Sequence, residues 1–133
     1  MSPGAPSSPT DPRRRRLSFL AVNGGYLAAT AAESLLAPVL PLAARELRLD
    51  VADAGLAFAT LAGAIALGNL VGGVALSRSG PKPGAVGALL VSATAALLVA
   101  AVRGRTAFLA CQALVGLGSG AFFASGLYAA GAL

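Results

Sequence analysis

The chain alternates between four long apolar stretches and short segments that hold nearly all of its charged side chains. The four stretches cover 17–44, 54–77, 83–102 and 106–133. The first contains one charged residue, Glu33, and the other three contain none. A helix needs roughly 20 mainly apolar residues to cross about 30 Å of hydrocarbon, so each stretch is long enough. Runs of Ala, Leu, Val and Gly without alternating polarity favour helices over barrel strands. The pattern predicts an all-α integral membrane helical bundle of about four transmembrane helices.

The boundaries of these spans follow from the charges and helix breakers between them. We expect a disordered tail with a basic cluster at 1–16, then a transmembrane region at 17–133 with spans at about 17–42, 51–76, 84–102 and 106–132. Pro38 and Pro41 predict a kink or an end in the first span, because Pro lacks a backbone donor. Asp50 can cap the second span. Short connections predict antiparallel neighbours.

Composition supports the membrane assignment. Hydrophobic residues make up 56% of the chain and charged residues 11%, whereas soluble domains have about 25% charged residues. A soluble bundle, the alternative, would need a polar face on most helices. The tail, the basic cluster and the start of the first span also resemble a secretory signal peptide, but the apolar run continues and three spans follow.

Basic residues predict the orientation. Six lie on one side of the predicted bundle, at Arg13–Arg16, Arg78 and Lys82, and four on the other, at Arg45, Arg48, Arg103 and Arg105. Cytoplasmic flanks carry the excess of Lys and Arg. We therefore expect a multi-pass protein of the plasma membrane with a cytoplasmic N-terminus, and the net charge of +5 is no sign of nucleic-acid binding, because four of the ten basic residues form the run before the first span.

The residue inventory argues against an enzyme. The chain has no histidine and one cysteine, Cys111, so neither a metal cluster nor an internal disulfide is expected. It also lacks a phosphate-binding loop and a nucleophile–base pair. We expect no metal and no cofactor.

Glu33 is the most informative side chain, because an ionisable group in the middle of a span is costly and commonly marks an ion or substrate path. At 100° per residue it shares a polar stripe with Asn23, Tyr26, Thr30 and Ser34. A carboxyl group that binds and releases a proton suits a proton-coupled carrier or a cation binder. The alternative is a structural hydrogen bond to a neighbouring helix.

Two polar residues of the fourth span, Gln112 and Ser119, are seven apart and therefore share a face. Together with the first-span residues they complete the candidate substrate- or proton-binding set: Glu33, Asn23, Tyr26, Thr30, Gln112 and Ser119. Hydrogen bonding between helices is again the alternative.

Small residues recur at four-residue spacing in two spans. They are Ala64, Gly68 and Gly72 in the second span and Gly116, Gly120 and Ala124 in the fourth. Small side chains at this spacing let helix backbones approach closely, so we predict packing surfaces here.

The loop after the second span resembles a known motif. The run from Gly73 to Lys82 is similar to the signature loop of the major facilitator superfamily, which it matches at Gly73, Arg78, Gly80 and Lys82. Ser77 stands where the family has Asp, and Pro81 replaces one basic residue. In the family this loop helps to latch the inward gate. The resemblance therefore identifies Gly73, Ser77, Arg78, Gly80 and Lys82 as a gating-loop motif.

Two further stretches carry the same resemblance. Residues 37–56 are similar to the exit of the family's first helix and the entry to its second, and residues 111–124 to its fourth helix. Gln112 stands where a proton-coupled subset has Arg. The family has twelve helices in two halves of inverted three-helix repeats, so the resemblance implies the N-terminal four, a truncated fragment that needs the missing helices or another membrane subunit.

The function implied is transport of a small, unidentified solute across a lipid bilayer by a secondary transporter, with proton coupling as one option. Two alternatives stay open. One is a small four-helix multidrug exporter acting as a dimer, since Tyr26–Glu33 loosely resembles its first helix. The other is a non-transporting membrane scaffold subunit.

Overall fold

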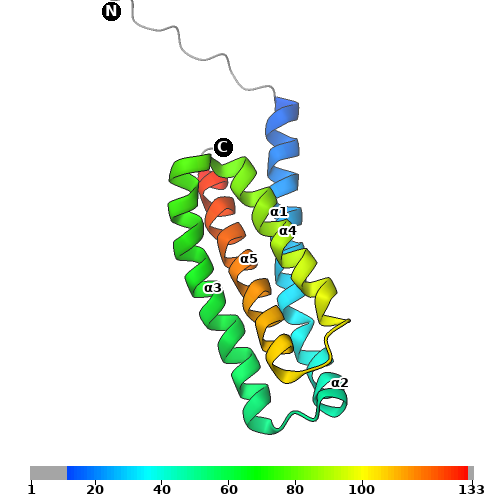
Figure 1. Cartoon of the computed structure of the whole chain (residues 1–133). Helices are drawn as coiled ribbons and strands as arrows, with labels where there is room; N and C mark the ends of the chain where they lie inside the picture. Colours follow the sequence, from blue (N-terminus) through cyan, green and yellow to red (C-terminus); the bar gives the residue numbers. More distant parts are fainter. Residues whose placement is uncertain (1–11, 132–133) are drawn as a thin grey trace, which may run out of the picture.

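The computed structural model describes residues 12–131, which form helices joined by short connections (Figure 1). The helices are α1 (Pro12–Ser34), α2 (Leu36–Leu47), α3 (Val51–Ser79), α4 (Pro81–Val99) and α5 (Arg105–Gly131). Four stretches are long and apolar enough to cross a membrane: Arg16–Leu47, Val51–Ala75, Lys82–Val99 and Arg105–Tyr128. The predicted all-α bundle with four spans is confirmed.

Two helices begin earlier than the sequence pattern predicts, and both begin at proline. Pro12 starts α1, so residues 12–16 of the expected tail are helical, while residues 1–11 lie outside the described part of the chain. Pro81 starts α4, three residues before the expected start of that span. Proline suits the first helical position because its missing N–H would be unpaired there and its φ is already helical.

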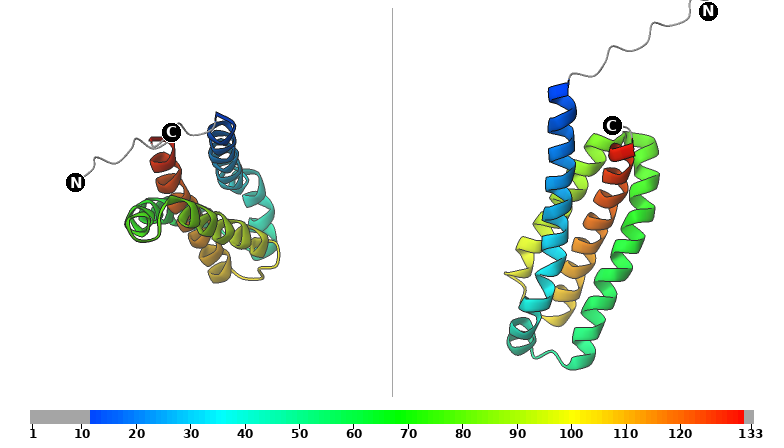
Figure 2. Two further views of the ribbon diagram at one scale, coloured as in Figure 1. Left: turned by 90° about the horizontal axis from the view of Figure 1, so that it is seen from above. Right: turned by 180° about the vertical axis from the view of Figure 1, so that it is seen from behind.

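The first span is broken into two helices at Leu35, between α1 and α2. Pro38 explains the position of the break, because its ring clashes with the carbonyl group four residues earlier, which belongs to Ser34. The chain then stays helical through Pro41 as far as Leu47, so the predicted polar connection is shorter than 43–50. Seen from above, α2 leans away from the axis of α1 (Figure 2).

Helix α5 occupies the centre of the bundle. It packs between α3 and α4 and also contacts α1 (Figures 1 and 2). Phe108, Val115 and Phe122 recur every seven residues on α5 and are almost fully buried, which places them on one inward face. The N-terminal end of α1 and the C-terminal end of α5 lie at the same end of the bundle (Figure 1).

Glycine allows α3 and α5 to approach at backbone distance. A side chain at Gly68 or Gly72 of α3 would meet the backbone of Leu117 or Ala121 of α5. From the other side, Gly116 faces the backbone of Leu61. The predicted packing role of the small residues in these two helices is therefore confirmed.

Paired aspartates begin α3. The Asp50 carboxylate accepts a hydrogen bond from the backbone N–H of Asp53 at 2.7 Å, and the Asp53 carboxylate faces the N–H of Asp50 at 3.4 Å. This reciprocal arrangement satisfies N–H groups that the first turn of a helix leaves unpaired. The predicted capping by Asp50 is confirmed.

Candidate functional site

Glu33 lies on the side of α1 that turns toward α5. Its side chain is partly buried, and its Oε1 atom is buried without a hydrogen-bond partner among the described residues. The Ser119 hydroxyl of α5 lies close enough to act on the carboxyl group by hydrogen bonding. The structure therefore brings together Glu33 and Ser119, two residues of the predicted binding set.

Ser119 also connects to α4. Its Oγ lies 3.3 Å from Oγ of Ser92, and the Ser92 hydroxyl donates to the carbonyl oxygen of Val115 at 3.4 Å. Ser119 is completely buried and Ser92 nearly so. We call these three side chains, Glu33, Ser119 and Ser92, the polar cluster; it links α1, α5 and α4.

Sequence reasoning missed Ser92. It is an isolated polar residue in an apolar helix, and a single serine forms no stripe that periodicity can detect. The sequence does single out two candidates, because Ser92 and Thr94 are the only polar residues between positions 84 and 99. Burial separates the two, because Ser92 is buried and Thr94 is exposed.

The other residues of the predicted stripe on α1 do not belong to the polar cluster. Asn23 is exposed and its side-chain amide donates to the carbonyl oxygen of Phe19 at 2.9 Å. Tyr26 is half-exposed and its ring packs on Phe123 of α5, with centroids 4.6 Å apart. Thr30 is exposed.

The reason is that α1 meets α5 through the face next to the stripe. Ala29 is buried on that face, and Gly25 lies against the ring of Phe122. Glu33 and Tyr26 stand at the border of the packed face and so reach α5. Asn23 and Thr30 lie further around the helix, on a side that the described residues leave open.

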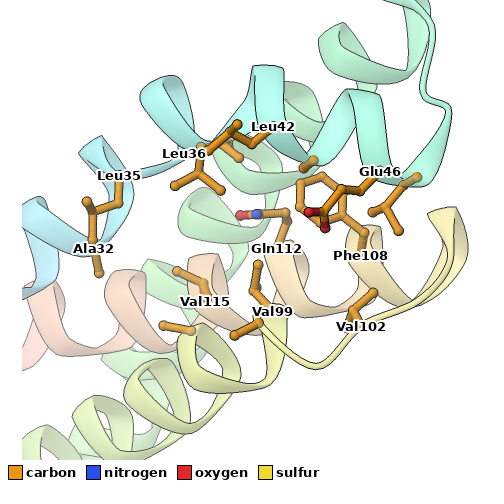
Figure 3. A pocket seen from close by; sticks show the side chains of 15 residues that line it. Ala32, Leu35, Leu36, Leu42, Glu46, Val99, Val102, Phe108, Gln112 and Val115 are labelled. Carbon is orange, nitrogen blue, oxygen red and sulfur yellow. The ribbon is translucent and has the colours of Figure 1, made fainter.

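Gln112 lies in a separate hollow, although it shares a face of α5 with Ser119. The hollow is a cavity of about 400 Å³ between α2, α4 and α5. Its walls are mostly apolar, with Leu36, Val99 and Phe108 among them, and Gln112 and Glu46 supply polar groups (Figure 3). Seven residues along a helix separate Gln112 from Ser119 by about 10 Å, so the two define different sites.

The gating-loop motif folds into a turn of a single residue. Helix α3 ends at Ser79 and α4 begins at Pro81, which leaves Gly80 alone between them. Gly80 has φ 81° and ψ 165°, a combination that is essentially restricted to glycine. The conformation thus explains the glycine of the motif.

The other residues of the motif surround this turn. Arg78 and Lys82 are exposed on either side of it, and Gly73 faces open space about two turns earlier on α3. The side chain of Ser77 lies outside the described part of the structure.

Metal-binding chemistry finds no support among the described residues. No group of three His, Cys, Asp or Glu side chains within 12–131 could hold a metal ion. The polar cluster and the cavity together present two carboxyl groups, of Glu33 and Glu46, the hydroxyl groups of Ser92 and Ser119, and the amide of Gln112.

Comparison with known proteins adds one match. The family model described as Major Facilitator Superfamily matches residues 22–133, which is most of the chain. No curated protein matches, and no solved structure matches. The matched region contains the polar cluster, the cavity and the one-residue turn.

Proposed function

We propose that this chain, which belongs to the major facilitator superfamily, takes part in secondary transport of a small solute across the membrane, with Glu33 as the residue that binds a proton or a cation. The family is one of transporters, and the four apolar helical stretches make the chain a multi-pass membrane protein. Transport by this chain and the binding role of Glu33 are our proposals.

The observation that carries the proposal is the unpaired carboxyl oxygen of Glu33 inside an apolar span. An ionised carboxyl group in hydrocarbon requires a partner. The described parts of α4 and α5 supply none that is charged, because their charged residues are Lys82 and Arg105, at the ends of the helices. A bound proton or a cationic ligand would neutralise the Glu33 carboxyl group, for which these helices supply only a hydroxyl group as a partner.

The cavity beside Gln112 supports a contact with an uncharged part of the solute. Sites for small molecules are concave and mainly apolar, with a few polar groups that fix orientation. The amide of Gln112 can both donate and accept hydrogen bonds. We propose that Gln112 contacts the solute, while Glu33, in the separate polar cluster, carries the coupling.

A complete path requires more helices than these. Transporters of this family consist of two halves, each built from two inverted three-helix repeats around a site near the bilayer midplane. The four spans correspond to one repeat and the first helix of the next. We propose that the remaining helices come from the rest of a longer protein or from another membrane subunit.

We also propose that the protein lies in the plasma membrane with the start of α1 in the cytoplasm. The support is the excess of basic residues at one end of the bundle, where Arg13–Arg16, Arg78 and Lys82 make six against the four at the other end.

The test replaces the carboxyl group with an amide. Glu33→Gln keeps size and hydrogen bonding but cannot ionise. In proteoliposomes containing the complete transporter, we expect this variant to fold normally and to lose proton movement or the uptake of a cationic probe such as tetraphenylphosphonium. Asp50→Asn is the matched control, because Asn caps a helix as well as Asp does and the site lies at a helix end.

The pH dependence separates this role from a structural one. A Glu33→Gln variant that keeps the wild-type flux and its pH dependence would show that Glu33 only bonds α1 to α5. Absence of flux in the wild type for every solute in a broad panel would favour the scaffold function instead.

A further inference from the structure

The polar cluster is a row of neighbouring polar groups with two unlike ends. One end is the Glu33 carboxyl group, which lies within reach of the Ser119 hydroxyl. The other end is the carbonyl oxygen of Val115, which accepts from Ser92, and the two hydroxyl groups meet in between at 3.3 Å. The path therefore runs from α1 through α5 to α4 and returns to the backbone of α5.

Each hydroxyl group has one hydrogen to donate, whereas a carbonyl group only accepts. A protonated carboxyl group can donate, but an ionised one can only accept. With Glu33 protonated, all hydrogens can point one way, from Glu33 to Ser119, from Ser119 to Ser92, and from Ser92 to Val115. With Glu33 ionised, the favoured order is opposite, from Ser92 to Ser119 and from Ser119 to Glu33.

We propose that the Ser119 and Ser92 hydroxyl groups reverse their hydrogen-bond direction when Glu33 gains or loses its proton, so that the state of Glu33 is transmitted to the contact between α4 and α5. This inference rests on the proposed function, in which Glu33 titrates. It assigns Ser119 and Ser92 as positioning residues, because Ser92 acts on Glu33 only through Ser119.

The receiving end of the path lies at a tight helix contact. A side chain at Gly118 would meet the backbone N of Ser92 and the carbonyl oxygen of Ala88, which shows how closely α4 and α5 approach there. When Glu33 ionises, Ser92 turns its hydrogen away from Val115, and α4 loses a side-chain hydrogen bond to the backbone of α5. A change of one proton on α1 thus alters the pairing of two other helices.

Other titratable groups are remote from the path. On α5 they are Cys111 and Tyr128, eight and nine residues from Ser119, and Arg105; on α4 only Lys82 titrates. On α1, Tyr26 is about two turns from Glu33 and its ring lies on Phe123. The remaining described ones on α1 and α2 are Arg13, Arg16, Arg45 and Glu46, each twelve or more residues from Glu33.

Infrared difference spectroscopy of the full chain in lipid nanodiscs tests the path. The band of the protonated Glu33 carboxyl group is identified by its absence in Glu33→Gln, and its intensity is followed against pH. We expect Ser92→Ala to move the midpoint by about 0.4 pH unit, the size that follows from an average hydrogen bond between membrane helices. We expect the double variant Ser92→Ala/Ser119→Ala to move the midpoint no further than Ser119→Ala alone.

Ser125→Ala is the matched control. Ser125 is also a buried serine of α5, but its hydroxyl donates to the carbonyl oxygen of Ala121 in its own helix at 3.0 Å. Its removal should leave the Glu33 midpoint in place. An unchanged midpoint in Ser92→Ala, or an equal shift in Ser125→Ala, would overturn the path while leaving a titrating Glu33, and so the proposed function, intact.

A second measurement uses the unaltered side chains. A carbon-13 label placed by semisynthesis at the Val115 carbonyl group should change frequency with the same pH midpoint as the Glu33 band, because that carbonyl loses a hydrogen bond as Glu33 ionises. A label that does not respond to pH would contradict the reversal, even if Ser92→Ala failed to fold. A Glu33 band that never titrates would overturn both proposals.

Discussion

Asp53 and Arg105 form an ion pair that joins the first turn of α3 to the first turn of α5, with 2.8 Å between Oδ1 and Nη2. The two side chains differ in environment, since Asp53 is almost buried and Arg105 is more than half exposed. Asp53 also completes the reciprocal cap with Asp50. One carboxylate therefore fixes both the beginning of α3 and its position beside α5.

This dual role predicts that the two partners of the ion pair are unequal. Asp53→Ala should lower the free energy of unfolding by about 1 kcal/mol or more, because it removes half of the cap together with the ion pair. Arg105→Ala should cost less than about 1 kcal/mol, since the exposed guanidinium group is well solvated. Steric trapping in bicelles, which reports on unfolding, measures the change in free energy for both variants. Equal losses would mean that the cap contributes nothing.

The glycine contacts predict a position-dependent effect along α3. Gly68→Leu should reduce the folded yield strongly, because its side chain meets the Leu117 backbone, which cannot move aside. Overpacking of this kind costs typically 1–3 kcal/mol. Gly63→Leu on the same helix is the control, since a side chain there meets open space. Size-exclusion chromatography of membrane extracts measures the folded fraction, and equal yields would refute close packing.

The one-residue turn predicts that Gly80 tolerates no side chain. Gly80→Ala places a Cβ atom on a backbone with φ 81° and ψ 165°, a conformation that costs of order 1–3 kcal/mol for other residues. Gly87→Ala, within α4 and facing open space, should be neutral or stabilising by about 1 kcal/mol. Thermal unfolding in detergent, followed by circular dichroism, distinguishes the two. A Gly80→Ala protein as stable as Gly87→Ala would show that the turn adopts another conformation.

The proposed orientation predicts alternating accessibility of the connections. Single cysteines at Ser8, Arg48, Ser79 and Gly104, in a chain with Cys111 replaced by Ala, should be labelled from the cytoplasm, the outside, the cytoplasm and the outside. Membrane-impermeant maleimide applied to intact cells and to inverted vesicles reads out each side. Labelling of positions 8 and 48 from the same side would exclude a crossing between them.

Much of this fold is predictable from sequence because lipid imposes long apolar helices. The charge-poor stretches and the charges between them locate the four spans, and the spacing of Gly68 and Gly72 locates a packing surface. Asp50 identifies a helix start. Each of these signals is local, so the chain reveals it without knowledge of the tertiary contacts.

Other features depend on partners that the local sequence does not identify. Polarity places Asn23 and Glu33 in one stripe, but only the packed face of α1 decides which of them reaches α5. Gln112 and Ser119 share a face and still have different surroundings, because Gln112 lines the cavity bordered by α2 and Ser119 is covered by Ser92 of α4.

The central position of α5 has a consequence for biosynthesis. Helices α3 and α4 are joined by a single residue, but each packs mainly against α5, which is also the main partner of α1. A ribosome makes α5 last of the four spans. Until it emerges, the earlier spans stand in the bilayer as separate helices without their main partner. Assembly of the whole bundle therefore begins only when α5 enters the membrane, and a nascent chain arrested before residue 105 should lack the protease resistance of the finished protein.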